Sequence, residues 1–295
     1  MEMFNVPNTV KNALSYKYVW GDEFDGSELN RKVWVNYGNK SDDDAVIIDE
    51  NGEKHTFVGN RHQVKSDGVY VDGGNAVIEA IHSVDSKTGE HSFVNRQIST
   101  SGTMSYKYGY LEIKAKLPVH PNAVAFWLGS TTSPQTNAFT ELDMIETIYS
   151  TDNNDDVCLT NIHSWDDDRE QKRSLDDYPK EKDKATKIDT TLSKEFHTYG
   201  FEWTPDVMKF YMDGNCYYSY SITDGVMCKK PNGDDNVDTF RQPMDLRLSS
   251  TMGLGFYGPI WSVGEPDKTV LLIDYVRLFQ IDDGESELYI NGKKK

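Results

Sequence analysis

The hexapeptide Glu141-Leu-Asp-Met-Ile-Glu146 places three carboxylates among three large apolar side chains. Apolar neighbours of this kind predict a strand packed on a core. Because side chains alternate along a strand, Glu141 and Asp143 share one face, and Glu146, at an odd offset, faces the other side. One extra residue, a β-bulge, would return Glu146 to the face of the other two acids. The outer carboxylates would then lie about 5–5.5 Å apart, the spacing at which a retaining glycosidase uses one as nucleophile and the other as acid/base.

The abundance of acidic residues leaves a second interpretation open. The chain has 48 Asp and Glu among 295 residues, so three acids in six positions also fit a strand without a catalytic role. A serine or cysteine nucleophile has less support, since the sequence contains neither a Gly-x-Ser-x-Gly elbow nor a Cys–His signature.

The formal net charge of −17 argues against nucleic acid and anionic membranes as partners, because both select basic patches. A neutral polymer is easier to accommodate as substrate. The 17 Tyr, 12 Phe and 6 Trp suit strands and cores, and such rings also stack on sugars.

Three cysteines, Cys158, Cys216 and Cys228, allow at most one internal disulfide. Cys216 and Cys228 could pair across a loop, or all three could stay reduced. No stretch approaches the length of a membrane helix. The first 14 residues lack the basic-then-apolar pattern of a signal peptide, so the protein is either cytoplasmic or made with a signal peptide that this sequence does not include.

Short alternating apolar runs separated by turn residues predict an all-β sandwich or barrel. The segment Met208–Tyr218 is predicted to be a hairpin that turns at Asp213-Gly214. We expect an N-terminal arm (1–15), a single domain (16–282) and a polar tail (283–295). Two hydrophilic insertions, 39–60 and 165–191, are predicted to be long loops.

Seven further stretches occur in an order and spacing that resemble glycoside hydrolase family 16: VWGDEFDG (19–26), YGYLEIKAKLP (108–118), AFWLG (125–129), NIH (161–163), FHTYGFEWTPD (196–206), FYMDG (210–214) and IDYVRL (273–278). The resemblance covers residues 18–280 and implies a concanavalin A-like β-jelly-roll sandwich of two curved antiparallel sheets with a concave cleft. It also implies retaining hydrolysis, with Glu141 as nucleophile, Glu146 as acid/base and Asp143 tuning the nucleophile. Such an enzyme is expected to be secreted, periplasmic or at the cell surface, and to act as a monomer.

The resemblance suggests further site residues, each with a structural alternative. His163 is expected near the acid/base, or else is an ordinary strand histidine. Trp127 is expected to border the cleft, or else packs in the core. The remaining candidates are sugar platforms on loops (Trp165, Trp261), residues that bind sugar hydroxyls or sulfate (Arg96, Asn60), and a ligand of a structural calcium on the convex side (Asp274). No cofactor is expected for catalysis.

The substrate is expected to be a polysaccharide with internal β-linkages, first a β-1,3-glucan. Residues 244–259 depart from the Gly-Gly-x-Trp-Pro-Gly-like string of family laminarinases, which keeps a β-galactan of the agarase, porphyranase or carrageenase type as the alternative. The bulged signature disfavours the unbulged lichenases. A non-catalytic carbohydrate-binding sandwich is the second alternative.

Overall fold

The computed structural model describes residues 4–10, 13–36, 45–48, 54–58, 68–89, 91–118, 122–130, 139–147, 155–165, 172–174, 185–223, 240–252, 254–255, 258–259 and 266–295. Within these ranges the chain forms strands, a 3-10 turn η1 (Ala13–Ser15), and no α-helix. No helix in this part of the protein is long and apolar enough to span a membrane.

One of two large sheets carries the acidic hexapeptide and is called the acid sheet. Its strand order is β14-β13-β12-β11-β19-β9-β23-β24, with β15 beside β13, β8 beside β19 and β2 beside β8. The strands are β2 (Val35–Asn36), β8 (Arg96–Ser99), β9 (Met104–Lys107), β11 (Ala123–Ser130), β12 (Thr140–Glu146), β13 (Val157–Trp165), β14 (Lys172–Ser174), β15 (Ala185–Lys187), β19 (Met244–Thr251), β23 (Glu287–Ile290) and β24 (Lys293–Lys294).

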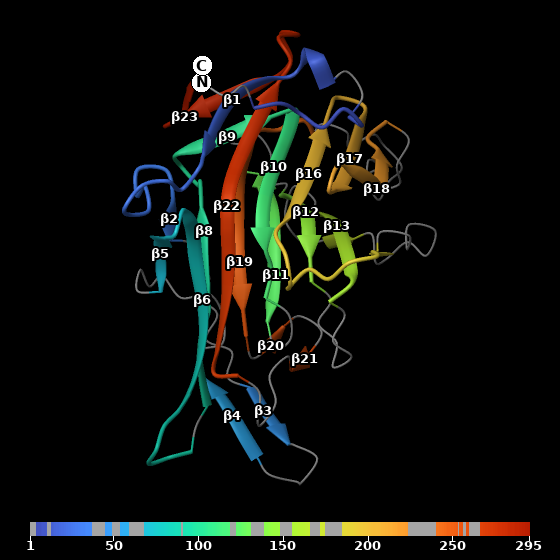
Figure 1. The fold of residues 1–295 in the computed structure, drawn as a ribbon. Coiled ribbons are helices and arrows are strands. Elements are labelled where there is room, and N and C mark those ends of the chain that lie inside the picture. Colours follow the sequence, from blue (N-terminus) through green and yellow to red (C-terminus); the bar gives the residue numbers. More distant parts are fainter. Residues whose placement is uncertain are drawn as a thin grey trace.

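The other large sheet is covered by the N-terminal arm and is called the arm sheet. Its order is β18-β17-β16-β10-β22-β6-β7-β4-β3, with β1 beside β22 and β5 beside β6 (Figure 1). The strands are β1 (Lys17–Asp22), β3 (Ala45–Ile48), β4 (Lys54–Val58), β5 (Val69–Asp72), β6 (Asn75–Val84), β7 (His91–Val94), β10 (Gly109–Lys116), β16 (His197–Trp203), β17 (Val207–Met212), β18 (Asn215–Ser221) and β22 (Lys268–Gln280). A separate pair joins β20 (Leu254–Gly255) to β21 (Gly258–Pro259).

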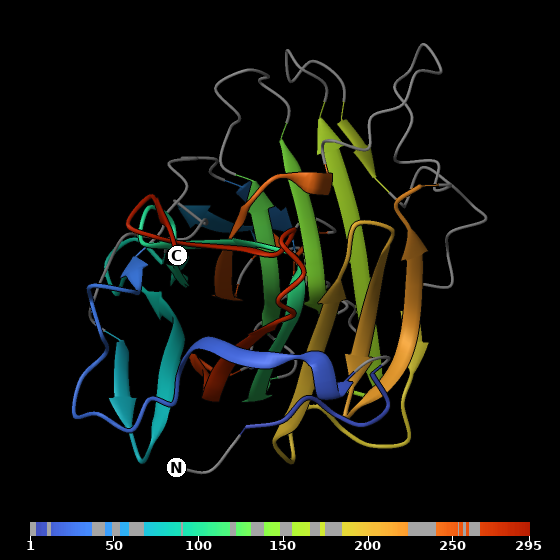
Figure 2. The ribbon, with the colours of Figure 1, turned by 90° about the horizontal axis from the view of Figure 1, so that it is seen from above.

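The core lies between the two sheets, which face each other as two layers (Figure 2). Apolar side chains at alternate positions of both sheets form one buried cluster. Phe126, Leu142 and Leu248 enter it from the acid sheet, and Ile113 and Phe201 from the arm sheet. Burial of apolar surface from two facing sheets is what holds such a sandwich together. The predicted all-β sandwich is therefore confirmed.

The predicted hairpin at 208–218 is present as β17 and β18. Asp213 and Gly214 have φ values of 47° and 76°, as a two-residue type I′ turn requires. The polar tail predicted at 283–295 was wrong, because β23 and β24 form a second hairpin that pairs with β9. Its turn is Asn291-Gly292, also with positive φ at both residues. The alternation in Glu-Leu-Tyr-Ile followed by Asn-Gly is typical of a hairpin, but the polar residues around it favoured the prediction of a tail.

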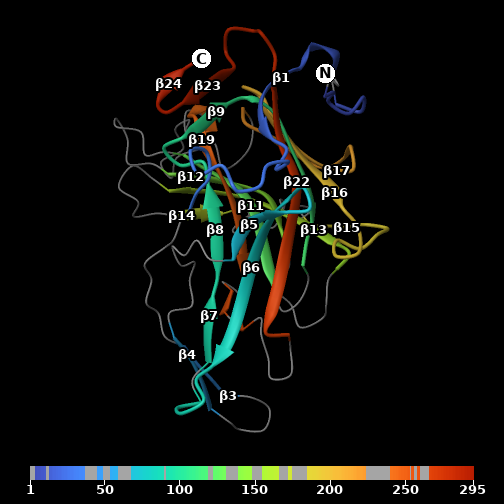
Figure 3. The same cartoon turned by 60° about the vertical axis from the view of Figure 1, so that its left-hand side comes forward.

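The two insertions predicted to be long loops also contain strands. Residues 39–60 include β3 and β4, which form a hairpin at the end of the sandwich opposite β23 and β24 (Figure 3). Backbone pairing to β7 extends the arm sheet through β4. Residues 165–191 include β14 and β15, which both pair with β13. Pairing with an existing sheet edge explains strands in segments whose polar composition does not predict them.

The N-terminal arm packs on the outer face of the arm sheet. Val6 and Val10 share a second buried cluster with Tyr110, Tyr211 and Phe279. The nearby Cys216 is an exposed free thiol, so it takes no part in the disulfide with Cys228 that the sequence left open.

The buried Glu112 of the arm sheet gives a stability prediction. It accepts hydrogen bonds from the hydroxyls of Tyr275 (2.8 Å) and Tyr110 (3.1 Å). Burial raises the pKa of Glu112 above its ordinary value of 4.5, although both hydroxyls and Arg277 oppose the rise. Because the folded-state pKa is raised, the stability that this residue contributes is complete below about pH 4.5 and is lost as the pH rises through the folded value.

Glu112→Gln, which stays neutral, is therefore expected to be about 1 kcal/mol more stable than the wild type at pH 8. The two proteins should have equal stability at pH 4. Urea unfolding at both pH values measures the difference. A variant that is less stable at pH 8 would show that the ionised carboxylate is the better hydrogen-bond partner.

Candidate active site

The three acids lie on β12, between β11 and β13. Glu141 pairs with Gly129 of β11 and with His163 of β13. Asp143 pairs with Trp127 and Asn161 in the same two strands. Cross-strand partners project to the same side of a sheet, so these side chains form rows across one face, which we call the acid face.

The predicted β-bulge is present between Asp143 and Glu146. Asp143 opposes Asn161 while Glu146 opposes Leu159, so three steps along β12 match two along β13. Glu146 pairs with Ala125, which lies on the same side of β11 as Trp127 and Gly129. The extra residue leaves both Met144 and Ile145 in the core and brings Glu146 to the acid face.

The acids differ in their exposure to solvent. Asp143 is 2 % exposed and Glu146 8 %, whereas the side chain of Glu141 is 23 % exposed. Glu141 is thus the most accessible acid of the three. Carboxylates in different environments can hold different protonation states, as a paired acid and nucleophile must.

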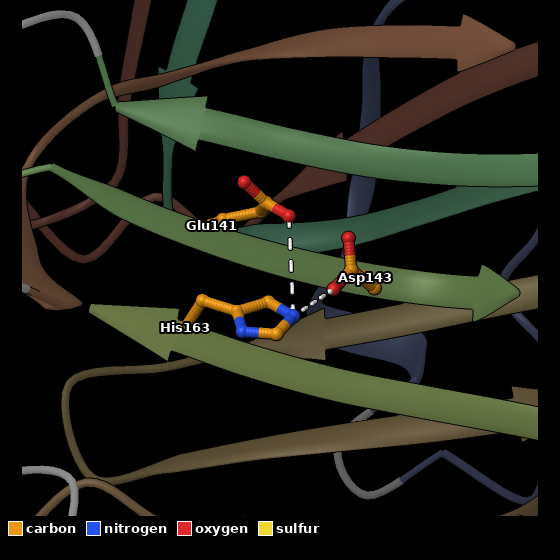
Figure 4. A group of neighbouring side chains, drawn as sticks. All are labelled: Glu141, Asp143 and His163. Atoms are coloured by element: carbon orange, nitrogen blue, oxygen red, sulfur yellow. Dashed lines mark ion pairs between the residues drawn. The ribbon is translucent and has the colours of Figure 1, made fainter. Parts of the chain in front are cut away.

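His163 reaches the acids from β13 (Figure 4). Its Nε2 lies 3.2 Å from Asp143 Oδ2 and 4.0 Å from Glu141 Oε1. His163 opposes Glu141 in register and lies beside Asp143, whereas its expected closeness to Glu146 stays a prediction. An imidazole here can hold the Asp143 carboxylate and limit the motion of Glu141.

The same three side chains also satisfy the spacing of a metal site. One ligand atom from each of Glu141, Asp143 and His163 lies within 4.8 Å of the others. Two carboxylates and an imidazole could bind a divalent ion. A metal site of this kind gives no role to Glu146, whose return to the same face requires the bulge, whereas glycoside hydrolysis uses both outer acids.

Trp127 lies on the acid face as expected and is partly exposed. Its indole Nε1 donates a hydrogen bond to Gln97 Oε1 (3.3 Å), and the guanidinium carbon of Arg247 lies 4.2 Å from the ring centroid. Gln97 and Arg247 were missed by sequence reasoning. Their positions on β8 and β19 become informative only when the pairing of these distant strands is known.

Arg96 does not line the acid face. In the β8–β19 register, Gln97 and Ser99 oppose Ser249 and Arg247, so Arg96 points to the opposite side. It is 2 % exposed and donates a hydrogen bond from Nη1 to the Glu79 carbonyl (2.7 Å) in the arm sheet. The expected sugar contact was wrong by one position along a strand.

Three other candidates receive no structural test. Asn60 and Trp261 lie outside the described residues, and for Trp165 only the backbone, in β13, is described. These residues stay predictions.

Asp274, the expected calcium ligand, forms an ion pair in the arm sheet. It is the extra residue of β22 at a register shift against β10, and its Oδ2 lies 2.6 Å from Lys114 Nζ. An ammonium ion at this distance repels a divalent cation. In the described part of the chain, the only grouping of acids and histidines with ligand spacing is the one on the acid face. The expected structural calcium, for which backbone carbonyls would supply the other ligands, stays a prediction, and no step of the proposed reaction depends on it.

Comparisons with known proteins identify the family of this chain. A family model described as "Beta-porphyranase A-D, GH16 domain" matches residues 18–281. The chain is 25 % identical to "Beta-glucanase" of Rhodothermus marinus, over 91 % of this chain and 86 % of that protein. It is 24 % identical to "Beta-porphyranase B" of Phocaeicola plebeius, over 94 % and 89 % of the two chains.

A solved structure described as "Prominent members of the human gut microbiota express endo-acting O-glycanases to initiate mucin breakdown" has the same fold. It superposes with a TM-score of 0.62 at 25 % identity, over 91 % of this chain and 92 % of that one. Fold and site together define a glycoside hydrolase built on a β-jelly-roll sandwich. Because the family model matches nearly the whole of this chain, the chain belongs to glycoside hydrolase family 16.

Proposed function

We propose that the protein is a retaining endo-glycosidase that hydrolyses internal β-linkages of a polysaccharide by double displacement. The observation that carries the proposal is the bulge in β12, which brings Glu146 to the face of Glu141 and Asp143. Core packing alone does not require this bulge, whereas two-carboxylate chemistry does.

In the first step, the Glu141 carboxylate attacks the anomeric carbon while Glu146 protonates the departing glycosidic oxygen. The bond to the leaving sugar breaks and a glycosyl–Glu141 ester forms. In the second step, Glu146 takes a proton from water, the water oxygen attacks the anomeric carbon, and Glu141 leaves as a carboxylate. Two inversions retain the anomeric configuration. Glu146 is the better candidate for the acid, because it lies beyond the bulge, at the position that the family signature gives to the acid/base.

Asp143 and His163 support the nucleophile. The Asp143 carboxylate lies in contact with the His163 imidazole, and both neighbour Glu141. This arrangement can orient the attacking oxygen of Glu141 and can exchange a proton with it as the ester forms and breaks. Substitution of either residue should therefore affect the formation of the ester more than the binding of substrate.

The first candidate substrate is a β-1,3-glucan. The name of the Rhodothermus relative supports a glucan, and an uncharged polymer suits a chain of net charge −17. The second candidate is a β-galactan. It is favoured by the description of the matched family model and by the name of a relative, "Beta-porphyranase B".

The test is the release of reducing ends from laminarin, mixed-linkage glucan, agarose, porphyran, κ-carrageenan and mucin. Large oligosaccharides early in the reaction would indicate internal cleavage, and NMR of the first products would report the anomeric configuration. We expect one polymer class to be cleaved with retention, and Glu141→Gln to be inactive on it. Inverted products would overturn the mechanism, whereas binding without turnover would favour the non-catalytic alternative.

The size of the substrate also bears on where the enzyme works. A polysaccharide does not cross a membrane unaided, so we propose action in the periplasm, at the cell surface or outside the cell. Because one sandwich carries all three acids, we also propose that a monomer is sufficient. Sedimentation at the concentration used for activity would test the second point.

A further inference from the structure

On the acid face, the guanidinium of Arg247 lies above a glycine that leaves room for it. Its guanidinium lies directly over Gly129 of the neighbouring strand: a β-carbon added at Gly129 would lie 2.7 Å from Arg247 Cζ and 2.8 Å from Nη2. Any larger residue at position 129 would therefore displace the guanidinium. The absence of a side chain at this one position of β11 makes room for the charge.

Two further contacts fix the guanidinium. Its Nε lies 2.9 Å from Asp245 Oδ1, and the side chains of Arg247 and Asp245 are only 5 % and 1 % exposed. Its Cζ lies over the indole ring of Trp127, whose Nε1 donates a hydrogen bond to Gln97 Oε1. Burial raises the pKa of Asp245 while Arg247 opposes the rise, so the two charges depend on each other. A buried ion pair is costly to build, and this one lies beside the site.

The guanidinium of Arg247 also lies close to the proposed nucleophile, Glu141. Gly129 is the direct cross-strand partner of Glu141, about one strand spacing away, so the guanidinium lies over the strand that adjoins Glu141. Among the described side chains of β8, β11, β12, β13 and β19, the charged and titratable groups that share the acid face with Glu141 are Asp143 and Glu146 on β12, His163 on β13, and Asp245 and Arg247 on β19. β11 contributes none. In the rows of side chains described on this face, Arg247 is the only Lys or Arg.

We propose that Arg247 is a positioning residue of the acid face, which holds the Trp127 ring ready for a sugar and keeps a fixed positive charge beside Glu141. The proposal rests on the function proposed above. A ring held on one face by the guanidinium and at its edge by Gln97 presents only its other face, and an ordered aromatic platform loses less freedom on binding. A nearby cation favours the ionised form of Glu141, which attack requires.

The test separates the two roles with a pair of substitutions. Arg247→Met removes the charge and the guanidinium contact with the Trp127 ring, whereas Arg247→Lys keeps the charge alone. We expect Arg247→Met to raise KM about tenfold, the scale of one lost aromatic contact, and to move the acid limb of the kcat/KM profile to higher pH. Arg247→Lys should restore the acid limb and leave KM raised. A loss of fold stability alone would not raise KM in both variants while shifting the acid limb in Arg247→Met only.

A second variant covers the case in which Arg247→Met folds poorly. Gly129→Ala keeps the charge in the chain but pushes the flexible guanidinium aside, and no positive φ at Gly129 forbids alanine. It should raise KM as Arg247→Met does, and the double variant should be no worse than either single one. Additive effects would overturn the proposal.

Arg277→Met is the matched control. Arg277 also combines a carboxylate partner, Glu23 (2.7 Å), with a stacked ring, Tyr275 (3.5 Å), but it lies in the arm sheet. Its KM and pH profile should equal those of the wild type. Cleavage by the wild type with unchanged KM and acid limb in Arg247→Met would overturn this inference and leave the proposed function intact. A wild type that releases no sugar from any polymer would overturn both.

Discussion

Glu141→Gln is expected to lower kcat on the polysaccharide by about 10⁴-fold or more, the scale of losing a nucleophile. The amide has the size of the carboxylate but no charge with which to form the glycosyl ester. Substrate binding should change little, because the remaining contacts of the acid face persist. Initial rates of reducing-end release and calorimetric titration with an oligosaccharide measure the two effects.

Azide, a small anion, can show directly which side chain is the nucleophile. Glu141→Ala leaves space where the carboxylate stood, and azide can attack the anomeric carbon from that space. The product should then be a glycosyl azide of inverted configuration, which identifies the vacated side chain as the nucleophile. Glu28→Gln, at an exposed position, serves as the control and should behave as the wild type. Activity of Glu141→Gln within tenfold of the wild type would refute the assignment.

Glu146→Gln is expected to lower kcat on the polysaccharide by about 10²–10⁴-fold, the range of general acid catalysis. The loss should depend on the leaving group. The hydroxyl oxygen of a leaving sugar departs only when it is protonated, whereas an activated aryl group departs as a stable phenolate anion. Formation of the glycosyl ester from an aryl glycoside should therefore be almost unaffected, and a burst of phenolate should precede slow turnover.

The pH dependence gives a second measurement on the same variant. The basic limb of the wild-type kcat/KM profile reports loss of the proton from the acid, so it should disappear in Glu146→Gln while the acid limb stays. Because three carboxylates share the face, both limbs belong to the coupled group as well as to single residues. Equal losses on polymer and aryl substrates would assign Glu146 another role.

Local patterns were sufficient to predict β12. Glu146 lies at an odd offset from Glu141 with apolar residues between them. Without a bulge it would face away from the other acids, and the bulge is present. The hairpin at Asp213-Gly214 was equally local. Both depend on alternation and turn geometry within a few residues, which a sequence states directly.

Contacts between distant strands were not predictable in this way. Arg247 lies 120 positions along the chain from the Trp127 ring that it covers, and nothing near it in sequence indicates that β19 pairs with β11. Arg96 shows the opposite error: the strand was correct, but a shift of one residue exchanges the acid face for the core, and Gln97 holds the indole instead. The contact of His163 with Asp143 likewise depends on the register of β13 across β12, which the sequence does not state.

The bulge makes this strand respond unequally to changes in its length. Loss of Met144 would give Glu-Leu-Asp-Ile-Glu, in which all acids fall at even offsets, so a regular strand would keep them on one face over nearly the same span. Gain of a residue would either turn Glu146 into the core or, in a regular strand, lengthen the span by two residues, about 6.8 Å, beyond the reach of the two-carboxylate reaction. A deletion, ordinarily the change that ruins a strand, is here the tolerated one, and related chains should shorten this segment more readily than they lengthen it.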